Sequence, residues 1–234
     1  MRTLLVNGQI YSLVENFATA ILVEDGIIAW IGSEGGADVH RADVDRVVDL
    51  EQDLVTAGFV NLASDEVYPQ AGFVHAQTAD IPIANGWDEQ QWQDHAQRPV
   101  AVVPTSDCRL RSRIAMGVAT ALAPEHPQTS GWETVRAAVH LVSAQERLTA
   151  RGAFSALTRG AWRLIGQPDQ GVLALGAMAT FVQWRAKDLV VESPDERISN
   201  WSTDPRSATP GLPRLQLGHP LPDVTRVWKQ GIPQ

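Results

Sequence analysis

The stretch LVTAGFVNLASDEV, Leu54 to Val67, decides how the rest of the sequence is interpreted. Its apolar run opens into polar residues, which is typical of a buried β-strand that ends at a site. Two carboxylates, Asp65 and Glu66, follow the run directly. They are either metal ligands at the end of the strand or a solvated pair of acidic side chains.

The composition is that of an ordinary soluble globular protein with one or two domains. The 234 residues are 44% hydrophobic and 20% charged, and the formal net charge is −8. Because this charge is negative and no run of Lys or Arg occurs, nucleic acids and anionic membranes are poor partners. No window approaches the roughly 18 apolar residues of a membrane span. Cys108 is the only cysteine, so no disulfide forms within the chain, which favours a cytoplasmic location.

Both ends of the chain are predicted to be β-structure. Asn7-Gly8 and Asp25-Gly26 each separate two strand-like runs, and both dipeptides favour the tight turn of a β-hairpin. Strands are also expected over 171–184 and 188–193, followed by a Pro-, Gly- and Ser-rich loop over 199–223 and a last strand. The two ends together therefore predict one small β domain.

The middle of the chain has an α/β pattern. Short apolar runs predict strands over 55–62, 80–85, 99–103 and 118–123, and the polar segment 86–97 is expected to be helical. A helix over 130–142 is indicated by a capping box of Ser130 and Glu133. A second helix over 149–166 begins at Thr149 and ends at Gly166.

Several strings resemble the amidohydrolase superfamily, and within it the branch of N-substituted formamide deformylases. The opening strands of that family are similar to NGQIYS and AILVEDGIIAWIG. Its first barrel strand, PGF(V/I)D-x-H-x-H, is similar to LVTAGFVNLASDE, and its G-x-GWDE-x-x-W segment to IANGWDEQQW. Its GSDxPVTP…PW…AAV segment is similar to ALAPEHPQTSGWETVRAAVH.

The resemblance implies a metal-dependent (β/α)8 barrel with a β-sandwich built from both chain ends. A complete barrel takes at least about 200 residues, whereas only about 108 separate Gly58 from Gly166. The expected fold class is thus α/β plus β. It consists of a composite β-sandwich, 1–56 and 170–234, and a truncated TIM-barrel remnant, 57–169.

The departures from the family's pattern carry the functional argument. Ala63 and Asp65 stand where the resemblance implies two metal-binding histidines, and Glu125 stands where it implies a catalytic aspartate. The catalytic candidates are therefore Glu125 and Asp65, with His126 as a possible ligand or proton shuttle. Each has an alternative as a solvated side chain. No two of the six histidines have His-x-His or i, i+4 spacing.

Three functional hypotheses remain open. The first is a catalytically inactive relative kept as a binding or oligomeric structural protein, with no metal or other cofactor and with a small molecule as ligand. The second is a zinc-dependent hydrolase of non-peptide C–N bonds with a rebuilt site. The third is a subunit that docks on a full-length homologue. Because a shortened barrel exposes strand edges, a homodimer that covers them is also expected.

Overall fold

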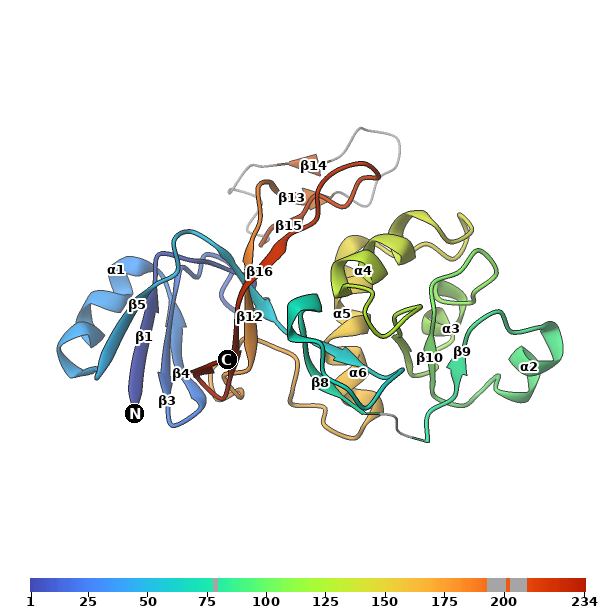
Figure 1. Ribbon diagram of the computed structural model, residues 1–234, viewed down its shortest axis with the longest axis horizontal. Helices are drawn as coiled ribbons and strands as arrows, with labels where there is room; N and C mark the ends of the chain where they lie inside the picture. The colour runs from blue at the N-terminus through green and yellow to red at the C-terminus, as the bar shows by residue number, and fades with distance from the viewer. Residues whose placement is uncertain (78–79, 193–200, 203–209) are drawn as a thin grey trace. The chain divides into compact units, whose positions relative to one another are not determined.

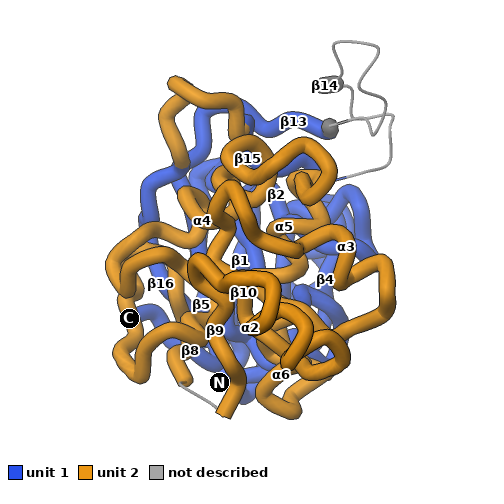
Figure 2. The backbone as a smooth tube through the Cα atoms, turned by 90° about the vertical axis from the view of Figure 1, so that its right-hand side faces the viewer, with its two compact units in different colours: residues 1–58, 172–214, 222–234 blue, residues 59–171, 215–221 orange. Residues whose placement is uncertain are grey.

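The chain folds into two compact units in this computed structural model, which describes residues 1–77, 80–192, 201–202 and 210–234. Unit 1 comprises 1–58, 172–214 and 222–234, and unit 2 comprises 59–171 and 215–221 (Figure 2). Within the loop predicted over 199–223, residues 199–200 and 203–209 lie outside the described residues. Among the described residues, no helix combines the length and apolar character needed to span a membrane.

The first sheet of unit 1 has the strand order β4-β3-β1-β5. The strands β3 and β4 form the hairpin predicted at Asp25-Gly26, where both residues have positive φ angles of 48° and 85°. In the same sheet β1 is antiparallel to β3 and parallel to β5. The bounds are Arg2–Val6 for β1, Ala20–Glu24 for β3, Ile27–Gly32 for β4 and Arg46–Asp49 for β5.

The hairpin predicted at Asn7-Gly8 is wrong. Asn7 does turn the chain, with a φ of 57°, but β2 (Gln9–Ile10) then joins a second sheet and pairs in parallel with β6 (Leu54–Ala57). A side chain at Gly8 would place its Cβ 2.6 Å from the Cδ1 atom of Leu50. The turn therefore serves close packing between sheets, which the dipeptide alone does not reveal.

The second sheet of unit 1 joins the two ends of the chain. Its order is β17-β16-β12-β6-β2, so β12 (Phe181–Arg185) lies between β6 from the first quarter and β16 (Asp223–Lys229) from the last. In the strand register Phe181 pairs with Ala57 of β6 on one side and with Trp228 of β16 on the other. The rings of Phe181 and Trp228 are stacked, with their centroids 5.6 Å apart. The edge strand β17 spans Ile232–Pro233. A small sheet, β14-β13-β15, completes the unit, with β13 at Leu189–Glu192, β14 at Trp201–Ser202 and β15 at Leu212–Pro213.

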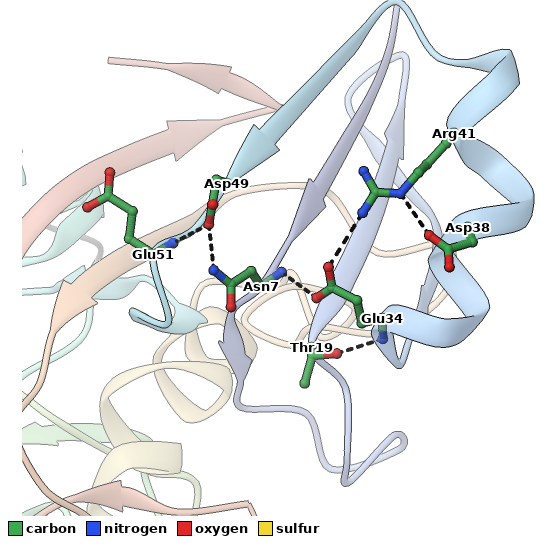
Figure 3. A network of polar contacts seen from close by, with 7 residues as sticks. All are labelled: Asn7, Thr19, Glu34, Asp38, Arg41, Asp49 and Glu51. Atoms are coloured by element: carbon green, nitrogen blue, oxygen red, sulfur yellow. Dashed lines mark hydrogen bonds and ion pairs between the residues drawn. The ribbon is translucent and has the colours of Figure 1, made fainter.

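A polar network stabilises the left-handed turn at Asn7 (Figure 3). The Asn7 backbone N–H donates to a Glu34 carboxylate oxygen at 2.9 Å, and the Glu34 N–H donates to the Thr19 hydroxyl at 2.7 Å. The Asn7 amide and the Glu51 N–H both donate to Asp49 at 2.8 Å, and these bonds lower the pKa of Asp49. The turn is therefore tied to β5 and to the first helical segment, which consists of α1 (Glu34–Ala37) and the 3-10 turn η1 (Asp38–Asp43).

The described part of unit 2 contains five short strands, and all of their pairings are parallel. They form two sheets, β7-β8 and β11-β10-β9, and no closed barrel is found within the described residues. The strand predicted over 55–62 divides at Gly58 between the two units, and β8 was not predicted at all. The bounds are Phe59–Asn61 for β7, Phe73–Ala76 for β8, Ile83–Ala84 for β9, Val100–Val102 for β10 and Thr120–Leu122 for β11.

The helices of unit 2 begin largely where their caps predict. The capping box of Ser130 and Glu133 is present at α4, and the Thr149 hydroxyl accepts the N–H of Gly152 at the start of α5. The helix predicted over 149–166 is interrupted at Thr158, whose hydroxyl bonds back to the Phe154 carbonyl. The bounds are Pro69–Ala71 for the 3-10 turn η2, Glu89–Asp94 for α2, Arg111–Ala115 for α3, Gly131–His140 for α4, Ala150–Leu157 for α5 and Arg159–Leu164 for α6.

The core of unit 2 has two parts on opposite faces of β7. Phe59 contributes to an aromatic cluster in which its ring lies 5.2 Å from Trp132 and 5.8 Å from Phe154. Val60, the next residue, packs in a second cluster with Trp162 of α6 and apolar residues of β10 and β11. This alternation is expected because successive side chains of a strand point to opposite faces.

Candidate functional site at the carboxyl ends of β7 and β11

The loop after β7 holds the first predicted site residues. Beyond Asn61 the chain turns through bonds of its own: the Ala63 N–H donates to the Asn61 side-chain oxygen at 2.9 Å, and the Glu66 N–H donates to the Ser64 hydroxyl at 3.0 Å. Asp65 lies in this turn and is exposed.

Glu66, the neighbouring carboxylate, is engaged by an aromatic hydroxyl. The Tyr68 hydroxyl donates a hydrogen bond to Glu66, and this bond raises the pKa of Tyr68. Both side chains belong to the same surface turn, so this contact is local to the loop. Within the described residues, Glu66 thus has a role as a hydrogen-bond acceptor in the turn.

The segment after β11 holds the other predicted site residues. Ala123 and Pro124 are buried, and the chain then emerges at Glu125 and His126, which are both exposed. The His126 carbonyl accepts the N–H of Thr129 at 3.0 Å, which closes the turn that leads into α4. Glu125 therefore lies at the carboxyl end of its strand, where parallel α/β folds carry their active residues.

A common core relates the two strand ends to each other. The strands β7 and β11 belong to different sheets, but α5 and α6 contact both of them. Val60 and Leu62 of the β7 segment share an apolar cluster with Ala121 and Ala123 of the β11 segment. The two carboxylates that the sequence singled out thus follow strands packed on the same pair of helices.

The side chains at these strand ends do not fit the divalent metal that the resemblance implies. Alanine at position 63 has no electron pair to donate, and the Glu125 side chain is exposed. Within residues 1–77, 80–192, 201–202 and 210–234, no group of three or more His, Cys, Asp or Glu side chains could hold a metal ion. A catalytic zinc needs three protein ligands and an open position.

Asn61, at the end of β7, is a buried polar residue that the sequence analysis did not single out. It is 0% exposed, its oxygen is fixed by the Ala63 N–H, and its Nδ2 has no hydrogen-bond partner among the described residues. Leaving a buried donor unpaired costs about 1–3 kcal/mol, and such exceptions occur mainly at functional or strained sites. The available signal was a lone amide within an otherwise apolar strand.

His75 also lies on an unpredicted strand, and its contacts are those of a packing residue. Its ring lies 4.6 Å from the Trp162 ring, and its Nε2 is 3.3 Å from the Gln77 side-chain oxygen. Val60, its partner in the β7–β8 register, packs in the same cluster as Trp162. His75 and Asn61 therefore occupy opposite faces of the β7–β8 sheet.

The segment around α2 is structural. Asp88 caps the helix in a capping box with Gln91. Arg113, only 2% exposed, donates from one nitrogen to the carbonyls of His95 and Arg98 beyond the helix end, and its guanidinium lies over the Trp92 ring at 5.6 Å. Burial and the nearby Arg109 lower the pKa of Arg113. The Arg113 guanidinium therefore stabilises the segment that follows the C-terminal end of α2.

Cys108 is a buried free cysteine. Burial is the main cause that raises its pKa to about 12, with a further contribution from the charge of Glu146. Since the thiolate is the reactive form of cysteine, the side chain is protonated and unreactive at neutral pH.

Comparison with known proteins identifies the fold. No protein-family model and no curated protein matches the sequence. Solved structures do match: an enamidase described as a member of the amidohydrolase superfamily is 12% identical with a TM-score of 0.53, over 100% of this chain and 95% of that one.

Two other neighbours have higher TM-scores. A mutant atrazine chlorohydrolase from Arthrobacter aurescens TC1, complexed with zinc and atraton, is 10% identical with a TM-score of 0.62, over 99% of this chain and 94% of that one. Guanine deaminase from E. coli is 12% identical with a TM-score of 0.61, over 99% and 97%. The chain therefore has a fold like that of the amidohydrolase superfamily.

Proposed function

We propose that this protein is a non-hydrolytic relative of the amidohydrolases, retained in the cytoplasm as a binding or oligomeric structural protein. The observation that carries the proposal is the set of side chains at the ends of β7 and β11. Ala63 stands where the family resemblance implies one metal ligand, and the Glu125 carboxylate is exposed. These residues do not supply the ligands that the chemistry requires.

The physical reason is the cost of activating water. A bound metal lowers the pKa of its water from 15.7 to about 7, and this is what makes hydroxide available at neutral pH. A preorganised site holds its groups within about 0.5 Å of the productive geometry. Glu125 is one methylene longer than the aspartate that the family resemblance implies, so its carboxylate cannot occupy the same place on the same backbone.

The retained role would be the binding of a ligand that accepts a hydrogen bond. Asn61 supports this part of the proposal, because its buried Nδ2 is a donor without a partner among the described residues. A carbonyl or carboxylate oxygen has the matching chemistry. The unpaired donor is then explained as half of a contact that a ligand completes.

Metal analysis of the full chain, purified without chelators, tests the proposal. We expect far less than one zinc ion per chain and no hydrolysis of formamides or other non-peptide amides above the uncatalysed rate. About one zinc ion per chain that is lost in Glu125→Ala but kept in Glu15→Ala would refute it. Glu15 is a suitable control because it is an exposed carboxylate of unit 1, outside both strand ends.

The second candidate function is hydrolysis of non-peptide C–N bonds at a rebuilt zinc site. The zinc complex of the chlorohydrolase neighbour favours it, and the ligands would be drawn from Asp65, Glu125 and His126. The same metal analysis separates the two candidates, because a rebuilt site requires bound zinc. A third role, as a subunit of a full-length homologue, predicts that affinity-tagged chain captures such a homologue from its native host.

A further inference from the structure

Two asparagines of the chain are followed directly by glycine, in the pairs Asn7-Gly8 and Asn85-Gly86. An Asn-Gly pair can react within itself: the backbone nitrogen of the glycine attacks the side-chain carbonyl carbon of the asparagine and closes a five-membered ring. Because glycine has no Cβ, no side chain hinders the approach of its nitrogen. The local structure therefore decides which of the two pairs can react.

The reacting groups of Asn7-Gly8 are both held by hydrogen bonds. The Gly8 N–H, which would have to attack, donates to the Thr19 carbonyl at 2.9 Å. The Asn7 side-chain amide, which would have to be attacked, donates to a carboxylate oxygen of Asp49 at 2.8 Å (Figure 3). The space beside Gly8 is filled as well, since an added Cβ would lie 2.6 Å from the Cδ1 atom of Leu50. Ring closure at Asn7 therefore requires prior opening of the turn.

The Asn85-Gly86 pair lies in the loop that joins β9 to α2 (Figure 1). Both residues are exposed, and beyond its two chain neighbours no heavy atom lies within 4 Å of a Cβ added at Gly86. Among the described residues, the Gly86 N–H donates to no backbone carbonyl, and the last bond of β9 is the one from the Val103 N–H to the Ala84 carbonyl. Ring closure at Asn85 therefore requires no opening of the fold.

We propose that Asn85 is a self-modification site, at which reaction with Gly86 and water converts the asparagine into isoaspartate and aspartate. The Gly86 nitrogen loses its proton to solvent base and bonds to Cγ of Asn85. The bond from Cγ to the side-chain nitrogen then breaks and ammonia leaves, which gives a succinimide. Water opens the succinimide at the main-chain carbonyl, which leaves isoaspartate, or at the former side-chain carbonyl, which leaves aspartate. No group is oxidised or reduced.

The modification goes beyond the proposed function, because it occurs whether or not the protein binds a metal or a ligand. Each product adds a carboxylate to a chain whose formal net charge is already −8. Isoaspartate also lengthens the backbone path between β9 and α2 by one methylene group. Because ammonia is lost to solvent, the modified fraction increases with the time since synthesis and does not reverse.

Timed incubation of the full chain tests the proposal without any substitution. The native protein is kept at pH 8 in water labelled with heavy oxygen and is then digested. Mass spectrometry compares the peptides that contain Asn7 and Asn85, after chromatography has separated isoaspartate from aspartate. Incorporated heavy oxygen shows that the conversion took place during the incubation.

The expected result is selective conversion of Asn85. Conversion should be about tenfold or more faster there than at Asn7, because opening of the Asn7 turn breaks two hydrogen bonds and one of these has a charged acceptor. In urea the turn is lost, so the two rates should become similar. Asn85→Gln is a matched variant, since it keeps the amide but would need a six-membered ring. Ion-exchange chromatography should show that this variant accumulates no acidic form over the same period.

Several results would overturn the inference. One is an Asn85 that stays intact in the folded chain, and another is equal conversion of Asn7 and Asn85 in the native protein. A difference between the two rates that persists in urea would also overturn it, because neighbouring residues rather than the fold would then be the cause. So would an acidic form of Asn85→Gln as abundant as that of the wild type. The measurement on the wild-type chain decides the question even if the variant fails to fold.

Discussion

Replacing Gly131 by alanine should destabilise unit 2 more than the same replacement at Gly152 or Gly160, the other glycines of its helices α4 to α6. Gly131 is the first residue of α4, and a Cβ there would lie 1.9, 2.3 and 2.5 Å from three ring atoms of Phe59. Carbon atoms pack at about 3.5–4.0 Å, so the ring would have to move by about 1.5 Å. Phe59 is 0% exposed and is confined by Trp132 and Phe154, which leaves it no free direction.

The magnitude follows from overpacking. Forcing an extra methyl group into a filled core costs about 1–3 kcal/mol and occasionally more, and contact with three ring atoms of Phe59 places Gly131→Ala at the upper end. Helix propensity returns at most about 1 kcal/mol, so we expect a net loss of about 2–3 kcal/mol. Urea unfolding followed by tryptophan fluorescence measures it.

A control variant separates the steric effect of the added methyl group from the higher helix propensity of alanine. Gly35, in α1, is exposed and has nothing within 4 Å of an added Cβ. Gly35→Ala should therefore be neutral or stabilising by up to about 1 kcal/mol. If Gly131→Ala changed the free energy of unfolding by less than about 0.5 kcal/mol, the range of an ordinary surface substitution, the described packing of Phe59 against α4 would be incorrect.

Three further outcomes are expected. Ser130→Ala should cost about 1 kcal/mol in urea unfolding, because it removes the acceptor that caps α4; no change would mean that the capping box contributes nothing. The Glu51 N–H and the Asn7 amide lower the pKa of Asp49. The contribution of ionised Asp49 to the stability of the folded protein is therefore complete above the pKa that Asp49 has in the unfolded chain. It is lost as the pH falls through the lower pKa that Asp49 has in the folded protein. Carboxyl NMR titration should show this lowered pKa, and Asn7→Ala should raise it. Finally, a thiol reagent at pH 8 should label Cys108 slowly in the folded protein and rapidly in urea, since its pKa of about 12 keeps it protonated; rapid labelling of the native chain would contradict its burial.

Local signals in the sequence predicted one hairpin turn and the starts of two helices. The caps at Ser130 and Thr149 mark true helix starts, and the Asp25-Gly26 turn is a true hairpin, because each depends on bonds between residues a few positions apart. Thr158 shows the limit of this reasoning. The apolar spacing continues through it, but its backbone is not helical and α5 ends there.

Features that depend on distant partners were not predictable from local patterns. Asn7-Gly8 has the composition of a hairpin turn, yet the close approach of Leu50 to Gly8 sends β2 to another sheet. Similarly, β8 is too short and too weakly patterned to be recognised without its partner β7. For the candidate site, Asp65 and Glu125 were located at strand ends by family resemblance, whereas the buried amide of Asn61 became visible only from its hydrogen bonds.

The place of β12 between β6 and β16 sets the order in which the nascent chain can mature. As the ribosome releases the polypeptide, the contiguous stretch 59–171 is available to fold long before the last strands are synthesised. The apolar sides of β2 and β6 must wait for residues 181–185 and 223–229. The strands β2 and β6 are therefore completed by partners that are synthesised more than 120 residues later.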